Sequence, residues 1–497
     1  MTTTITPVNA EKRDAGGAPP PSGRPEDARL SFATSLGYGL QHILSMFGGV
    51  IAVPIIVGGA AGLSSSQIAL LLSCSLLVSG LATLLQTVGV PGLGAQLPLV
   101  QGISFASVST LLTIVGGRGE AGMRDAMGAV LAAAVIAMLV VPFFAQIVRF
   151  FPPVVTGSII TVIGLSLLPV AAGWITGQAT RGGRPNPDFA APSNLALAAF
   201  SLVVVLLLSR FEKVSRMAIL LALVAGTVAG LVTGQAHLSV ADASLFALPT
   251  PLAFGTPTFH LGSILAMLVV MLVVMVETTA DILAVGEVIG TPVDEKRVAN
   301  GLRADMLCSA LAPVLNTFPA TAFAQNVGLV ALSGIRSRWA VAMGGGILAA
   351  LGLSPMLAAV VSTIPQPVLG GVGIVLFGTV AASGIRTLSK VDYDRTNNLL
   401  LVAVSVGAGL LPVVSDELWS RMPRWFEVIA ESGISACALV AVTLNILFNM
   451  GRGKELLVEN TFASAPALMV RDDELAMLAQ ERRGRGAVLV SDSRKDA

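Results

Sequence analysis

The segment NTFPATAFAQNVGLVALSGIRSR, from Asn316 to Arg338, decides how this chain folds. It lies among long hydrophobic stretches, yet it holds a proline, two glycines, amides and hydroxyls where lipid favours aliphatic residues. Backbone inside a bilayer must satisfy its own hydrogen bonds, so a broken segment survives only when it is buried in protein or lines a cavity. A second broken segment, LPLVQGISFASVST, runs from Leu97 to Thr110. Paired broken segments are typical of secondary transporters, which predicts a substrate held between these two.

Composition places the rest of the chain in a membrane. The 497 residues are 54% hydrophobic and 12% charged, and the charged fraction is about half that of a soluble domain. Hydrophobic runs of about 17–25 residues, each long enough to cross a bilayer, recur along nearly the whole length. We therefore predict an all-α polytopic membrane protein. The near balance of 30 basic and 29 acidic residues argues against a nucleic-acid partner.

About fourteen hydrophobic segments can be counted, of which the third and tenth are short and broken. Their expected spans are 33–58, 66–90, 96–115, 125–148, 153–175, 191–210, 215–234, 261–289, 298–315, 320–335, 338–362, 366–388, 396–414 and 430–449. Residues 1–32 are rich in Pro, Gly and charge, and we expect a disordered cytoplasmic N-terminal tail there. Residues 451–497 are polar and are expected to form a cytoplasmic C-terminal tail.

The loops between these segments differ in their content of Lys and Arg. Twelve of these residues fall in loops on the same side as the N-terminus, and six fall in loops on the other side. Cytoplasmic loops carry the excess of positive charge, so both termini are predicted to face the cytoplasm. An even number of spans agrees with that arrangement.

The sequence also contains an internal repeat. The stretch FPPVVTGSIITVIGLSLLPVAAGWI, from Phe151, resembles IPQPVLGGVGIVLFGTVAASGIRTL, from Ile364. The matching pairs are Pro152 with Pro365, Val155 with Val368 and Gly157 with Gly370. The two stretches and the two broken segments are each seven spans apart. An odd number of spans in a repeat forces the halves into opposite orientations, which predicts two inverted seven-segment repeats.

Two carboxylates stand inside the eighth segment, at Glu277 and Asp281. Residues four apart share one face of a helix. Carboxylates in a membrane interior are energetically unfavourable, and a pair within one turn indicates function. One of them is expected to accept N–H groups from the substrate, and the other to help carry a proton. The competing interpretation is a structural pair that neighbouring helix ends satisfy.

The tenth segment is interrupted at Gln325 and Asn326. A Gln amide both donates and accepts in one plane, which matches the edge of a base ring with alternating N–H and C=O groups. Gly328 lets the backbone approach a ligand closely. A helix that begins after the break also presents free N–H groups to a carbonyl-rich ligand. Local capping of the backbone would explain the same residues without a ligand.

The third segment has a similar arrangement, with Gln101 and Gly102 at its break and Ser104 and Phe105 behind them. Gln101 and Ser104 are candidate hydrogen-bonding groups, and the Phe105 ring could stack on a flat ligand. Capping is the alternative for Gln101, and plain packing is the alternative for Phe105.

Two further polar residues lie in hydrophobic segments. His42, early in the first segment, is expected to support the site by a hydrogen bond rather than to touch substrate. Asp305, in the ninth, is expected to tie helices together or to join the proton path. The three cysteines are widely spaced, with no His or Cys at metal-ligand spacing, so no metal or cofactor beyond a coupling proton is expected.

These residues carry a family likeness. The stretch QNVGLVALSG, from Gln325 to Gly334, resembles the signature of the nucleobase–ascorbate transporters. That signature reads Q, E or P, then N-x-G-x-x-x-x-T, then R, K or G. Ser333 stands where the family has Thr, which keeps the hydroxyl. The pair Gln41–His42 and the spacing of Glu277 and Asp281 match further family positions, and the likeness covers about residues 33–450.

The resemblance implies a core domain and a gate domain, with short strands in the third and tenth segments framing the substrate. It implies that Glu277 and Gln325 hold the base, that Asn326 shapes the site, and that His42, Asp281 and Asp305 support it or affect coupling. It also implies a homodimer in the cytoplasmic membrane that moves its substrate with protons. The core domain would comprise 33–148 and 261–362, and the gate domain 149–235 and 363–450.

Gln325 and Asp281 resemble the residues at these positions in the purine branch of the family. The sequence of the signature is similar to that of bacterial xanthine and urate permeases. The expected function is therefore proton-coupled symport of a purine base, urate or xanthine. A uracil or other nucleobase permease remains an alternative, as does a sulfate- or bicarbonate-type anion transporter of the same architecture. A passive channel suits paired broken segments less well, and no nucleophile–base pair or metal cluster suggests an enzyme.

Overall fold

A computed structural model of the chain describes residues 24–177, 180–181, 184–185, 189–215, 217–236, 246–393, 397–415 and 418–449. The expected C-terminal tail lies outside these residues. The first half contains η1 Pro25–Asp27, α1 Phe32–Ala60, α2 Ser65–Val88, β1 Gln101–Ile103, η2 Phe105–Ser107, α3 Val108–Val115, α4 Gly119–Val140, η3 Val141–Phe143, α5 Phe144–Ile147, η4 Val148–Phe150, α6 Pro153–Ser166, α7 Leu168–Thr176, β2 Thr180–Arg181, β3 Arg184–Pro185, α8 Pro192–Ser209, α9 Glu212–Ser215 and α10 Ala218–Val232. The second half contains α11 Leu261–Ile289, α12 Glu295–Leu311, β4 Ala320–Ala322, α13 Ala324–Ser333, α14 Arg338–Gly352, α15 Pro355–Ser362, α16 Gln366–Leu388, α17 Asn398–Val414, α18 Arg424–Glu431 and α19 Gly433–Asn449.

The helices follow the predicted hydrophobic segments. Among the described residues, seven helices are long and apolar enough to cross a membrane: α1, α2, α4 with η3, the α6–α7 pair, α8, α11 and α16. Four shorter apolar helices are η2 with α3, α10, α14 and α17, and the α18–α19 pair bends by 88°. With α12 and α13, these elements correspond one for one to the fourteen expected segments.

The helix ends follow local sequence signals. Ser64 forms a capping box with Gln67 at the start of α2, in which each side chain bonds the other residue's backbone N–H. Asp294 caps α12 by accepting from the N–H of Arg297. Proline opens α6 at Pro153, where its fixed φ suits the first turn and its missing N–H leaves no bond unmade.

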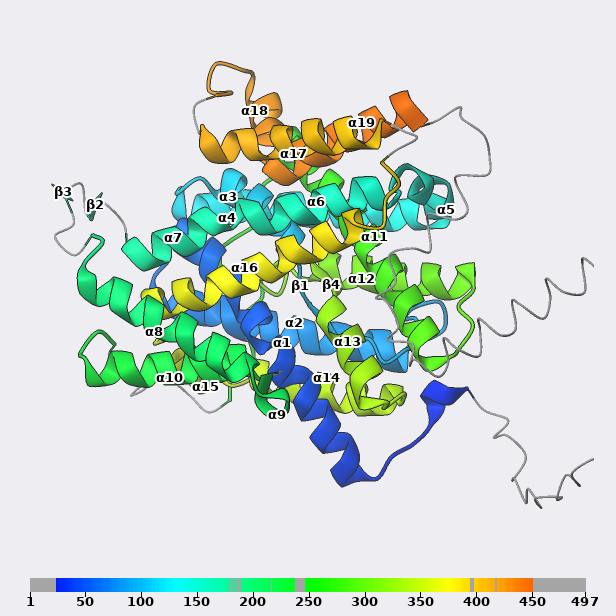
Figure 1. Cartoon of the computed structure of the whole chain (residues 1–497), viewed down its shortest axis with the longest axis horizontal. Coiled ribbons are helices and arrows are strands. Elements are labelled where there is room, and N and C mark those ends of the chain that lie inside the picture. Colours follow the sequence, from blue (N-terminus) through cyan, green and yellow to red (C-terminus); the bar gives the residue numbers. More distant parts are fainter. Residues whose placement is uncertain are drawn as a thin grey trace, which may run out of the picture.

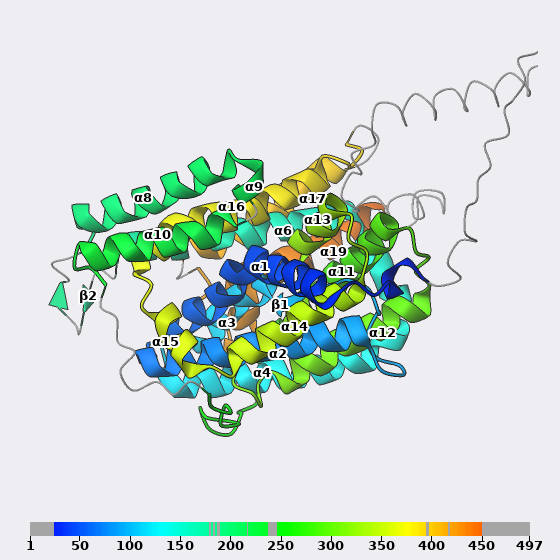
Figure 2. The ribbon, with the colours of Figure 1, turned by 90° about the horizontal axis from the view of Figure 1, so that it is seen from below.

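The helices form two packed groups. The first bundle comprises α1–α4 and α11–α15, and its most extensive contacts join α2 with α14 and α4 with α11 and α12. The second bundle comprises α6–α10 and α16–α19, in which α16 packs against α6, α7 and α8. Figure 2 shows α8, α10 and α16 on one side of the molecule and α2, α4 and α14 on the other. Substrate sites of transporters lie between such groups.

Strands β1 and β4, from the two broken segments, meet near the centre of the molecule (Figure 1). They pair antiparallel, with Gln101 opposite Ala322, Gly102 opposite Thr321 and Ile103 opposite Ala320. This pairing satisfies backbone groups that lipid could not satisfy, as the broken segments require. The expectation of short strands in the third and tenth segments is confirmed.

The inverted repeat is visible in the packing of α6 against α16, which lie side by side in both views (Figures 1 and 2). Gly157 on α6 lies against Leu388 near the end of α16. Its repeat partner Gly370 on α16 lies against Ile175 on α7, the residue that corresponds to Leu388. Each contact is thus the image of the other with the halves exchanged, which confirms the two-repeat architecture.

Close approach of α6 and α16 predicts opposite effects for two glycines of α16. A Cβ on Gly384 would lie 2.3 Å from the backbone nitrogen of Thr161, whereas a Cβ on Gly378 would meet nothing within 4 Å. We expect Gly384→Ala to destabilise the protein by about 1–3 kcal/mol through overpacking. Gly378→Ala should be neutral or stabilising by about 0.5–1 kcal/mol because alanine favours the helix. Melting temperatures of the two purified variants in one detergent would test this, and equal shifts would contradict the packing.

The segment before α1 differs from the sequence-based expectation. Residues 24–31 are not a disordered tail, because Glu26 is fully buried and its carboxylate pairs with Arg297 at 2.5 Å. Asp27 pairs with Arg338 at 2.6 Å. These two ion pairs attach the segment to the starts of α12 and α14, and the burial of a charge explains the order, since such a group persists when paired. Residues 1–23 lie outside the described part of the chain.

Candidate functional site

A cavity of about 410 Å³ lies between the two bundles. The first bundle lines it with η2, the middle of α11, β4 and the start of α13. The second bundle lines it with the start of α6 and one face of α16. Its volume falls in the range of small-molecule sites, roughly 300–1,000 Å³. The two broken segments and the eighth segment thus meet at one cavity.

Glu277 and Asp281 both line this cavity from α11. They lie one turn apart on the same face of the helix. Asp281 is 9% exposed, and it is close enough to Glu277 and Asp305 to interact with both charges. A cavity inside a membrane protein that is walled by two carboxylates can bind N–H groups of a ligand or hold a proton.

Asp305 lies behind the cavity wall rather than in it. Gln86 on α2 donates to its Oδ1 at 2.9 Å, and the Thr278 hydroxyl on α11 donates to its Oδ2. Gln86 also accepts from the N–H of Ala95 at 2.8 Å. Asp305 therefore joins α2, α11 and α12 in one buried network. Because Thr278 is the neighbour of Glu277, this network fixes the part of α11 that presents the carboxylates.

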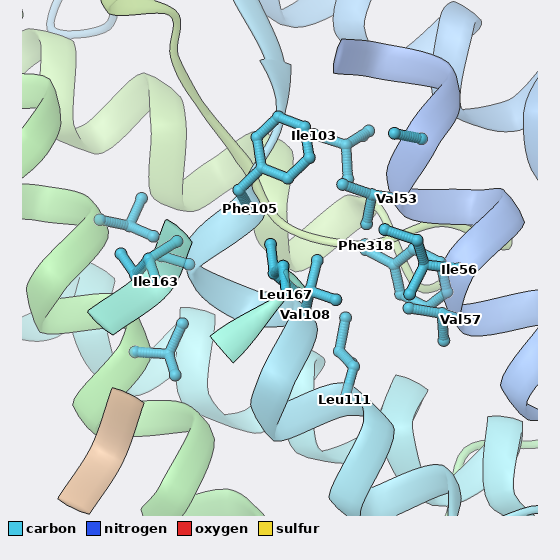
Figure 3. Close-up of a cluster of buried hydrophobic side chains, with 14 of the residues drawn as sticks. Val53, Ile56, Val57, Ile103, Phe105, Val108, Leu111, Ile163, Leu167 and Phe318 are labelled. Atoms are coloured by element: carbon cyan, nitrogen blue, oxygen red, sulfur yellow. The ribbon is translucent and has the colours of Figure 1, made fainter. Parts of the chain in front are cut away.

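Aromatic rings form another wall. Phe105 lines the cavity, and its ring centroid lies 6.4 Å from that of Phe323 and 6.2 Å from that of Phe377 on α16. Trp174 on α7 continues the row, 6.3 Å from Phe377. Figure 3 shows Phe105 between Ile163 of α6 and the cluster around Val53 of α1. The row of rings therefore crosses from the first bundle to the second.

The signature residues of α13 do not all face the cavity. Gly328 lines the cavity. Asn326 is fully buried and turned toward α1, where its Oδ1 accepts from Ser45 at 3.1 Å and its Nδ2 lies 3.8 Å from the Met46 sulfur. Asn326 is not among the residues that line the cavity. Gln325 belongs to α13, but its side chain lies outside the described part of the structure.

Several buried polar groups around β1 and β4 have no partner among the described residues. Both amide atoms of Gln101 are in this state, as are the hydroxyls of Ser104 and Thr321 and Nδ1 of His42. Thr321 lines the cavity, whereas Gln101, Ser104 and His42 lie behind it. Buried polar groups are nearly always hydrogen-bonded, so such a concentration needs a ligand or ordered water to satisfy it.

Sequence reasoning missed part of the lining. Phe323 stands two residues before Gln325, and its ring lies over Gly102. A Cβ added to Gly102 would come within 2.2 Å of that ring. The sequence signal for Phe323 was an aromatic residue next to the break in the tenth segment. On α16 and in the turn after it, the missed residues are Thr379, Ser383, Arg386, Thr387 and Lys390. Their spacing of three and four residues marks one helix face, which could have been read from the sequence.

The model of a permease family, Xan_ur_permease, matches residues 33–418. The match spans both broken segments and the carboxylate helix. The chain belongs to this family, the nucleobase–ascorbate transporters.

Characterised relatives match over most of their length. The uric acid transporter UacT of Escherichia coli (strain K12) is 39% identical over 428 residues, which cover 85% of this chain and 88% of the relative. The xanthine permease of Bacillus subtilis (strain 168) is 39% identical over 425 residues, 85% of this chain and 95% of the relative. The uric acid permease PucK of Bacillus subtilis is 40% identical over 413 residues, 82% and 94% of the two chains.

Solved structures share the architecture at low identity. The transmembrane domain of the cyanobacterial bicarbonate transporter BicA has a TM-score of 0.57 at 15% identity, and the match covers 85% of this chain and all of that domain. The anion transporter Slc26a9 of the mouse, in an inward-facing state, has a TM-score of 0.58 at 14% identity, with 85% and 69% of the two chains covered. At these identities the likeness concerns the fold alone.

Proposed function

We propose that the protein is a secondary transporter that carries a purine base, urate or xanthine, across the cytoplasmic membrane. The observation that carries the proposal is the position of Glu277, a carboxylate on the wall of a cavity that the Phe105 ring also lines. Relatives that this chain matches over about nine-tenths of their length are named for uric acid and xanthine transport, which supports it.

A flat base with alternating N–H and C=O groups suits this cavity. Glu277 accepts N–H groups from one edge of the ring, because an ionised carboxylate is an acceptor only. Phe105 and Phe323 offer aromatic surface against which the ring packs. Gln325 is proposed to bind the same base through its amide, and the unpartnered hydroxyl of Thr321 reaches it directly or through water. Gln101 and Ser104 are proposed to act from behind the lining, where water links them to the base.

Coupling to protons is part of the proposal. Asp281 lies one turn from Glu277 on the same cavity wall, so a proton held there travels with the substrate. Asp305 positions this pair of carboxylates from behind. In the proposed orientation both termini face the cytoplasm, on the side that carries the greater number of Lys and Arg residues. The first bundle corresponds to a core domain and the second to a gate domain, and the proposed unit in the lipid bilayer is a homodimer.

An inorganic anion is a poorer candidate for the cavity, although solved anion transporters share the fold. Glu277 and Asp281 would both repel it, and it lacks the N–H groups that an oxopurine, even as an anion, can donate to a carboxylate. Uracil remains a competing substrate because it carries the same alternation of N–H and C=O groups on a smaller ring.

Competition in whole cells tests the substrate class. Uptake of radiolabelled xanthine by expressing cells is expected to be inhibited by unlabelled urate and not by uracil or sulfate. Cells with the empty vector give the background. Inhibition mainly by uracil would overturn the purine assignment, and the absence of any xanthine uptake by well-expressed protein would overturn the proposal.

A further inference from the structure

One face of α16 forms a polar stripe along the cavity. Thr379, Ser383, Arg386 and Thr387 line it from the helix, and Lys390 lines it from the turn that follows. From Thr379 to Arg386 the stripe covers two helical turns, a distance of about 10 Å along the axis. It runs toward the start of α6, where Pro153 also lines the wall, because Gly157 of α6 lies against Leu388 at the end of α16. The stripe belongs to the second bundle, whereas Glu277 and Asp281 belong to the first.

Charge is separated along the cavity. Of the described residues that line it, the carboxylates are Glu277 and Asp281, and the cations are Arg386 and Lys390. Both cations are exposed. Partial burial and the neighbouring Arg386 lower the pKa of Lys390, and the charge of Glu287 on α11 acts in the opposite direction. The two cations are therefore close neighbours, and Glu287 faces them from the other bundle.

Two ordinary roles explain a cation in the last turn of a helix. It can complement the helix dipole, and it can anchor the cytoplasmic end of a span. Neither role requires the side chain to face a cavity. The hydroxyls on the same face do not supply the donors for a ligand, because Thr379 donates to the carbonyl of Leu376 at 2.7 Å and Thr387 to the carbonyl of Ser383 at 3.1 Å. The Arg386 guanidinium, in contrast, is suited to a planar anion that carries several oxygen acceptors.

We propose that Arg386 and Lys390 form a second binding station for the deprotonated, anionic form of an oxopurine at the mouth of the cavity. This inference rests on the proposed function and specifies the ionic form of the substrate that the mouth receives. Among the described residues that line the cavity, Arg386 and Lys390 are the cations, and they lie on the opposite bundle from the carboxylates Glu277 and Asp281. The station holds the anion before it reaches, or after it leaves, the carboxylates deeper in the cavity.

The test compares binding of an anionic and a neutral purine to the purified full-length protein. In mildly acidic buffer urate is an anion and xanthine is neutral. We expect Arg386→Gln to weaken urate binding about fivefold relative to xanthine, the effect of removing one unit charge near a solvated ligand. Arg386→Lys, which keeps the charge, should restore most of the affinity. Added salt should reduce the difference between the wild-type protein and Arg386→Gln.

Arg336→Gln is the matched control, because Arg336 is an exposed cation in the loop after α13 and does not line the cavity. It should leave both affinities unchanged. Equal losses for urate and xanthine in Arg386→Gln, or no loss, would overturn the station. If the wild-type protein binds only xanthine, the same comparison uses xanthine alone. It is neutral in mildly acidic buffer and anionic in mildly alkaline buffer. Failure of the wild-type protein to bind any purine would instead overturn the proposed function, and the station with it.

Discussion

Replacement of Glu277 by Gln is expected to abolish purine uptake while the protein remains in the membrane at its normal level. Gln has nearly the same shape, so the cavity is preserved. It replaces an acceptor with an amide that also donates, and that NH₂ group would face the N–H groups of the base. A hydrogen bond to a charged group contributes about 1.5–3 kcal/mol. Loss of two such bonds lowers kcat/KM for uptake by about 100-fold or more.

Initial rates of xanthine uptake, normalised to membrane protein by immunoblot, measure this effect. Glu295→Gln is the control, because Glu295 is an exposed carboxylate in the first turn of α12 and lies outside the cavity. Its removal should leave uptake unchanged. A Glu277→Gln variant with wild-type uptake would remove this carboxylate from the substrate site.

Replacement of Asp281 by Asn is expected to abolish the accumulation of xanthine while its exchange across the membrane continues. If Asp281 carries the coupling proton, the Asn variant still binds xanthine and exchanges it across the membrane, but it no longer uses the proton gradient. For a neutral substrate moved with one proton, 100 mV of membrane potential supplies about 2.3 kcal/mol, which supports about 50-fold accumulation. We expect the accumulation ratio of the variant to fall to about one.

Reconstituted vesicles allow both measurements on one preparation. Counterflow with unlabelled xanthine inside reports exchange, and uptake under an imposed gradient, with and without a protonophore, reports coupling. Loss of counterflow together with accumulation would place Asp281 in substrate binding instead. Wild-type accumulation that follows a sodium gradient and resists the protonophore would contradict proton coupling altogether.

Much of the fold was open to prediction because each element depends on local signals. The length of the hydrophobic run predicted α11 with its observed bounds, Leu261–Ile289. The repeat of Pro152 and Gly157 in Pro365 and Gly370 predicted two inverted halves, although not that α6 and α16 pack against each other. The broken segments predicted backbone that needs partners other than its own helix, and the family resemblance implied the short strands that the structure shows as β1 and β4.

The site was harder to predict because side-chain direction depends on tertiary packing. Asn326 stands beside Gln325 in the signature, yet it turns to Ser45 on α1 instead of the cavity. Gln101 and Ser104 lie behind the lining for the same reason. The order of residues 24–31 depends on the pairing of Glu26 with Arg297, a contact between residues far apart in the sequence. Composition alone suggested a disordered tail.

If the two halves of the molecule are exchanged, α6 takes the place of α16 and β1 takes the place of β4. The α6–α16 pair and the β1–β4 pair are therefore unchanged by the exchange. In a transition where each half takes the conformation of the other, such pairings survive unchanged, because each member replaces its partner. The α6–α16 pair lies in the second bundle and the β1–β4 pair in the first. The cavity lies between these two pairs, so a base bound there contacts both bundles. Its affinity therefore depends on how the two bundles are placed relative to each other.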